Sequence, residues 1–77
     1  MYDYLRDLLV TAFSVSDEIA PDKSLGDLGV DSLTTADICS TLEDDLKVSI
    51  GDREVNEDTT VGELADLLRN KGAVPSR

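Results

Sequence analysis

The feature that most limits what this chain can fold into is the spacing of its apolar residues. They recur every three or four positions in three separate stretches, which is the spacing of one face of an amphipathic α-helix. This spacing predicts helices over about residues 3–14, from Ser32 to Leu46, and from a Thr60 N-cap to near Lys71. The pattern therefore indicates an all-α fold.

The third predicted helix carries clear signals at both ends. Thr60 and Glu63 have the spacing of a capping box, in which each side chain accepts a hydrogen bond from the other residue's backbone N–H. Gly72 suits the left-handed position that follows a helix. We therefore expect one domain over residues 1–72, followed by a flexible tail over residues 73–77.

Residues 15–31 predict a long first loop, because they hold one proline and two glycines and show no helical spacing. Ser24 and Asp27 favour a short capped turn inside this loop. We expect the apolar side chains of the loop to tie it to the core: Ile19, Leu25, Leu28 and Val30. A further single helical turn is predicted over residues 52–57. The expected architecture is a small four-helix bundle, with three main helices, one short helix and a long first loop.

The second predicted helix has an apolar stripe and an acidic face. The stripe is expected to contain Leu33, Ala36, Cys39, Leu42 and Leu46, with Ile38 beside it. Cys39 is accordingly predicted to be a buried core cysteine. The residues expected to face outward are Asp37, Ser40, Glu43, Asp44 and Asp45.

The chain is strongly acidic, with seventeen Asp and Glu against seven Lys and Arg and a formal net charge of −10. Such a surface repels nucleic acid and favours basic patches on other proteins. Between Ser24 and Leu46 the chain has no Lys or Arg. Because crowded carboxylates raise one another's pKa, we expect the fold to gain stability in mildly acidic buffer.

Several kinds of function are excluded or disfavoured by composition. The chain has no histidine, which excludes a Ser-His-Asp triad and imidazole-ligated zinc. We therefore predict neither catalytic residues nor a specific metal site, and at most loose divalent binding at Asp44, Asp45, Asp52 and Glu54. No apolar run spans a membrane. A single cysteine and an N-terminus without a basic signal region favour the cytoplasm.

The run Gly29-Val30-Asp31-Ser32-Leu33 stands where the long loop gives way to the second helix. Asp31 is a good N-cap, and Ser32 falls on the first turn, where backbone N–H groups lack partners within the helix. A phosphate on Ser32 would meet those donors and the positive end of the helix dipole. A serine at this position is also common for structural reasons alone.

Taken over the whole chain, these features resemble the acyl carrier protein family. The shared features are the helix lengths, the long first loop with Pro21, the Asp31-Ser32-Leu33 run and the Thr-Val-x-x-Leu start of the last helix. The resemblance implies that Ser32 accepts 4′-phosphopantetheine from coenzyme A, whose thiol carries acyl groups as thioesters. Val30 and Asp31 resemble the acyl or polyketide type, and the early first helix suggests a free-standing carrier.

The resemblance also implies a partner-recognition surface on the second helix: Asp31, Leu33, Asp37, Glu43 and Asp44. The implied partners are a phosphopantetheinyl transferase and acyltransferase, ketosynthase or acyl-activating enzymes with basic docking patches. Neither nucleic acid nor a membrane is expected as a partner, and we expect a monomer. Ser40 takes a position that a larger apolar residue often fills in this family. Two alternatives stay open: an aminoacyl or peptidyl carrier, and an acidic helical interaction module without a prosthetic group.

Overall fold

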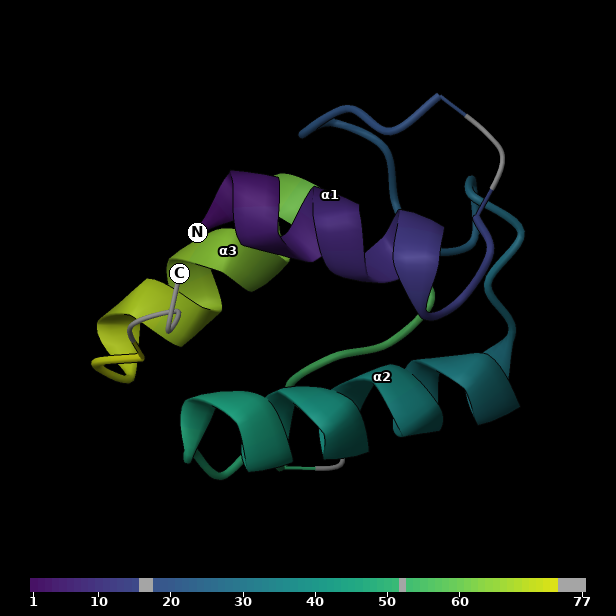
Figure 1. The fold of residues 1–77 in the computed structure, drawn as a ribbon. Coiled ribbons are helices and arrows are strands. Elements are labelled where there is room, and N and C mark those ends of the chain that lie inside the picture. Colours follow the sequence, from purple (N-terminus) through teal and green to yellow (C-terminus); the bar gives the residue numbers. More distant parts are fainter. Residues whose placement is uncertain (16–17, 52, 74–77) are drawn as a thin grey trace.

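The computed structural model describes residues 1–15, 18–51 and 53–73. Within them the chain forms three α-helices and no strand: α1 (Tyr2–Thr11), α2 (Ser32–Leu46) and α3 (Val61–Asn70). Helix α1 packs directly against α3, while α2 lies along another side of the molecule (Figure 1). The prediction of an all-α fold with three main helices is confirmed. None of the described helices combines the length and the apolar composition that a membrane crossing requires.

One apolar core holds the helices and the long connection together. The side chains that are almost completely buried come from all three helices and from residues 12–31: Leu5, Leu9, Leu25, Ile38, Leu42, Val61, Leu64 and Leu68. In the connection, Leu28 and Val30 are also buried, and Ile19 is half-buried against the core. The connection between α1 and α2 is therefore packed into the core by its own apolar residues, as expected.

Helix α1 ends at Thr11, three residues before the predicted end. Ser14 adopts a left-handed conformation with φ of 54°. That turn allows the N–H of Val15 to donate to the carbonyl of Leu9 at 3.0 Å and buries the Val15 side chain. The turn stops the helix because the chain folds back onto its last residues.

Helices α2 and α3 begin as the sequence predicts. Asp31 caps α2, and Ser32 is its first residue. At α3, the Thr60 side chain accepts from the Glu63 N–H at 3.1 Å, and the Glu63 carboxylate accepts from the Thr60 N–H at 2.9 Å. The capping box is therefore confirmed.

The end of α3 is closed by a Schellman motif. Gly72 takes a φ of +80°, and the N–H of Ala73 donates to the carbonyl of Leu68 at 3.0 Å. Ala73, the first residue of the expected tail, is buried, because this motif folds it back against the helix. The rest of the expected tail, residues 74–77, lies outside the described residues.

The short helix expected over residues 52–57 is not confirmed. Asp52 lies outside the described residues, and the segment that follows it forms turns. The N–H groups of Asn56 and Asp58 bond to local side chains instead of to backbone carbonyls four residues earlier, which favours turns over a helix. The side-chain hydrogen bonds of this segment run from Gly51 N–H to Glu54 (2.7 Å), from Asn56 N–H to Thr59 (3.1 Å) and from Asp58 N–H to Asn56 (2.8 Å).

Backbone hydrogen bonds fasten the α1–α2 connection to the segment that leads into α3. They join Leu25 N–H to Thr59, Gly26 N–H to Glu57, Val61 N–H to Lys23 and Gly62 N–H to Pro21, at 2.8–3.0 Å. The predicted turn at Ser24 and Asp27 is confirmed, because each side chain accepts from the other's N–H at 3.1 and 3.2 Å. A Cβ at Gly26 would lie only 3.2 Å from the Glu57 carbonyl, so glycine permits this close approach. The pairing brings residues 57–59 beside the start of α2.

Candidate functional site

Ser32 lies at the N-terminus of α2 with an exposed side chain. The Asp31 carboxylate before it accepts the Thr34 N–H at 2.8 Å, which confirms Asp31 as the N-cap. The Asp31 carbonyl accepts the N–H of Thr35 at 2.8 Å. The Ser32 hydroxyl therefore stands at the positive end of a well-formed helix, where the first backbone N–H groups point outward.

The carboxylate of Asp31 is held in its charged form. The hydrogen bond from the Thr34 backbone lowers the pKa of Asp31 below its ordinary value of 3.8. The pKa of Glu54 is also lowered, first by the Gly51 N–H and then by Lys71, whose Nζ lies 3.0 Å from Glu54 Oε1. Both shifts run opposite to the rise that we expected from crowded acids, because hydrogen-bond donors stabilise these two carboxylates more than desolvation destabilises them.

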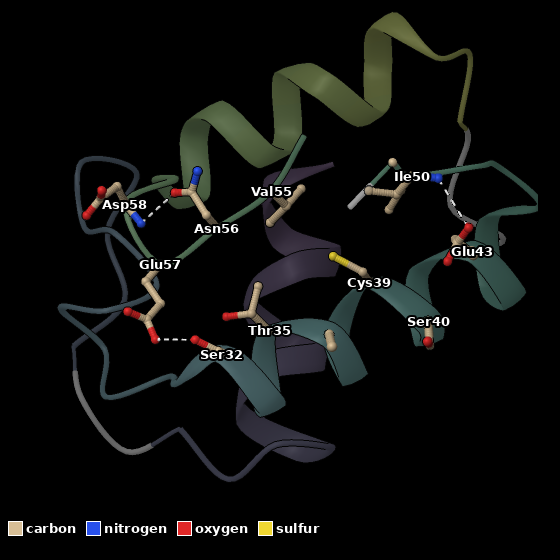
Figure 2. Close-up of a pocket in the computed structure, with 12 residues that line it drawn as sticks. Ser32, Thr35, Cys39, Ser40, Glu43, Ile50, Val55, Asn56, Glu57 and Asp58 are labelled. Atoms are coloured by element: carbon tan, nitrogen blue, oxygen red, sulfur yellow. Dashed lines mark hydrogen bonds between the residues drawn. The ribbon is translucent and has the colours of Figure 1, made fainter. Parts of the chain in front are cut away.

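Glu57 is a site residue that the sequence did not predict. The Ser32 hydroxyl donates to Glu57 Oε1 at 3.0 Å, across a separation of 25 residues (Figure 2). The contact depends on the pairing of Gly26 with Glu57, which places this carboxylate at the start of α2. No local pattern in the sequence signals such a contact.

A cavity of about 570 Å³ opens beside Ser32 and follows α2; we call it the α2 cavity. One end is formed by Ser32 and Glu57, and the other by Glu43 and Ile50 (Figure 2). Its walls combine apolar groups with hydroxyl, amide and carboxylate groups from α2 and from residues 50–58. The exposed serine thus stands at one end of an open cleft between the two segments.

The buried stripe of α2 differs from the predicted one. The buried residues are Thr35, Ile38, Leu42 and Leu46. Leu33 and Ala36, which we placed on the stripe, are exposed. Relative to the prediction, the helix is rotated about its axis so that Thr35 faces the core. The buried Thr35 hydroxyl is satisfied because it donates to the Asp31 carbonyl at 2.8 Å. The 3-4-4 spacing of these four positions is the signal that could have revealed the stripe.

Cys39, predicted to be a buried core cysteine, packs against the core but is only half-buried. Its side chain also lines the α2 cavity, because the helix is rotated so that Cys39 lies at the edge of the core. In residues 1–15, 18–51 and 53–73, no cluster of His, Cys, Asp and Glu is arranged to hold a metal ion. Asp52, one of the acids considered for loose divalent binding, lies outside the described residues.

The residues expected to recognise partners divide into two groups. Leu33 is 80 % exposed, and Asp37 and Asp44 are also exposed on α2. Glu43, which we expected on the outward face, is half-buried and accepts the Ile50 N–H at 3.2 Å. Its predicted outward orientation is wrong, because a backbone donor on the following loop draws the carboxylate toward the cavity.

Comparisons with known proteins identify the family. The family model described as "Phosphopantetheine attachment site" matches residues 3–68. The chain is 35 % identical to an acyl carrier protein of Streptomyces coelicolor, over 99 % of this chain and 86 % of that protein. It is 31 % identical to an acyl carrier protein of Clostridium perfringens strain SM101, over 88 % of this chain and 92 % of that protein. A search of solved structures found no match.

The chain belongs to the acyl carrier protein family, whose members have a phosphopantetheine attachment site. Its prosthetic group is a covalently attached 4′-phosphopantetheine. The residues fit this group: Ser32 offers an exposed hydroxyl for a phosphodiester link, at a helix N-terminus that favours the negative charge. The neighbouring cavity leaves room next to that hydroxyl.

Proposed function

We propose that Ser32 is the attachment residue, and that the chain carries acyl groups between the enzymes of fatty-acid or polyketide biosynthesis. The observation that carries this proposal is the position of the Ser32 hydroxyl, exposed at the start of α2 and beside the α2 cavity. Among the serines that the structure describes, Ser32 alone begins a helix. Membership of the carrier family supplies the chemistry.

In this function the prosthetic group supplies a thiol that holds the cargo as a thioester. The residues of the chain hold and orient the arm. Asp31 fixes the first turn of α2, and the helix N-terminus stabilises the phosphodiester charge. The α2 cavity offers space for the part of the arm or cargo closest to Ser32. The carrier itself performs no reaction on its cargo; the tether raises the effective concentration of cargo at each enzyme.

We propose that partner enzymes contact the exposed residues of α2. Leu33 contributes an apolar contact that the fold does not use, and Asp37 and Asp44 contribute charge. The partners fitting this surface are a phosphopantetheinyl transferase and acyltransferase, ketosynthase or acyl-activating enzymes with basic patches. Asp31 is also exposed, although its carboxylate already caps the helix. Glu43 contributes negative charge to this surface from the cavity side. We place this function in the reducing cytoplasm, in keeping with the single cysteine.

The proposal is tested by incubating the full chain with coenzyme A and a broad-specificity phosphopantetheinyl transferase, followed by intact-mass measurement. We expect one phosphopantetheinyl group per chain, and none on Ser32→Ala. Ser40→Ala is the matched control, because Ser40 is also an exposed serine that lines the α2 cavity, and it should be modified like the wild type. An unmodified wild-type chain, beside a carrier that is labelled in parallel, would favour the acidic interaction module. A peptidyl carrier would be modified equally and would be distinguished by the cargo found on protein from its native host.

A further inference from the structure

The hydrogen bond between Ser32 and Glu57 spans one end of the α2 cavity. The Ser32 hydroxyl donates to Glu57 Oε1 at 3.0 Å, and both side chains line the cavity. Figure 2 shows the Glu57 side chain reaching toward Ser32, whereas the neighbouring Asp58 carboxylate points elsewhere. The Glu57 carboxylate therefore lies across the cavity end closest to the proposed attachment atom.

The backbone of Glu57 is held independently of Ser32. Its carbonyl accepts the N–H of Gly26 at 2.8 Å, and the Thr59 carbonyl accepts the N–H of Leu25 at 3.0 Å. The two segments already approach so closely that a Cβ at Gly26 would come within 3.2 Å of the Glu57 carbonyl oxygen. These contacts fix the main chain, so a change at Ser32 acts on the exposed Glu57 side chain.

The bond between the two side chains depends on the single hydrogen of the Ser32 hydroxyl. A phosphodiester on Ser32 Oγ replaces that hydrogen with phosphorus and adds a negative charge beside the Glu57 carboxylate. The carboxylate then has no donor on Oγ and faces a like charge. In water, the repulsion of two unit charges about 4 Å apart corresponds to about a fivefold change in population.

We propose that the Glu57 side chain is a gate at this end of the α2 cavity. The Ser32 hydroxyl holds the gate closed in the unmodified chain, and a phosphodiester at Ser32 opens it. This inference rests on the proposed attachment at Ser32. Because the hydroxyl hydrogen is lost only on modification, the Glu57 side chain leaves the Ser32 end of the cavity only in chains that carry the arm.

The first test uses nuclear magnetic resonance on the full chain, before and after modification by the transferase. We expect a nuclear Overhauser contact between the Glu57 and Ser32 side chains in the unmodified protein. After modification, verified by intact mass, this contact should weaken at least about fivefold. The Gly26 N–H should keep its protection from hydrogen exchange. A contact that is absent beforehand or unchanged afterwards would overturn the gate, as would loss of Gly26 protection, which would mean that the backbone moves.

A second test examines the gate without the prosthetic group. Ser32→Asp places a carboxylate beside Glu57, whereas Ser32→Asn is similar in shape but neutral and can still donate a hydrogen bond. We expect the Glu57 contact to be lost in Ser32→Asp and kept in Ser32→Asn, with Asp58 unchanged in both. Equal behaviour of the two variants would overturn the gate. A chain whose mass does not change with the transferase would instead contradict the proposed function, so the two failures are distinguishable.

Discussion

Glu43 offers the sharpest test of the α2 geometry, because its neighbour Asp44 provides a matched control. The Glu43 carboxylate accepts the N–H of Ile50, a residue that is only 8 % exposed. Glu43→Ala would leave this partly buried donor without its acceptor, a change that costs about 1–3 kcal/mol. In a domain of this size, 1 kcal/mol corresponds to a fall in melting temperature of about 4–8 °C.

Asp44 is exposed and adjacent in sequence, so Asp44→Ala removes the same charge from the same acidic region. Its effect on the free energy of unfolding should stay within about 0.5 kcal/mol. Glu43→Gln keeps an acceptor oxygen and should retain most of the stability. The assay is urea unfolding followed by circular dichroism at neutral pH, with all variants at the same salt concentration.

Each alanine variant removes one negative charge from α2, so each relieves charge repulsion to a similar extent. The difference in stability between the two variants therefore reports the Glu43–Ile50 hydrogen bond. If both variants unfold at the same urea concentration, the Glu43–Ile50 hydrogen bond contributes nothing, and Glu43 belongs to the outward acidic face after all. If Glu43→Gln is as unstable as Glu43→Ala, the charge rather than the hydrogen bond matters, and our reasoning from the acceptor geometry is wrong.

Three further predictions follow from the same structure. Leu42→Ala should destabilise the fold by about 2–5 kcal/mol in urea unfolding, because Leu42 is fully buried; a loss below 1 kcal/mol would contradict the α2 packing. Asp31 and Glu54 have lower pKa values in the folded protein than in the unfolded chain. Their charged forms therefore stabilise the fold when the pH is above the pKa of the unfolded chain, and this stabilisation is lost as the pH falls through the pKa of the folded protein. The stability difference between wild type and Asp31→Asn should therefore shrink below about pH 4. A melting temperature that rises on acidification would instead support our original expectation from crowded acids. Finally, Asp37→Lys and Asp44→Lys should slow Ser32 modification by the transferase at low salt while leaving the fold intact, and unchanged rates would remove these residues from the docking surface.

The local features of this fold could be predicted because they depend on residues only a few positions apart. Helical periodicity located all three helices, and the caps at Asp31 and Thr60 were correct because each cap bonds to a backbone N–H three residues away. The prediction that Gly72 takes the left-handed position after α3 is confirmed for the same reason. The run around Ser32 likewise placed an exposed hydroxyl at a helix start, which is a local property.

Other features were decided by the tertiary structure. The rotation of α2 that buries Thr35 and exposes Leu33 depends on which face meets the core, and periodicity leaves neighbouring faces nearly equivalent. The inward turn of Glu43 requires the Ile50 N–H, which the loop after α2 supplies. The contact between Ser32 and Glu57 requires that the connection before α2 pairs with the segment before α3. Burial of one shared core brings these distant segments together, and no residue pattern within either segment encodes that meeting.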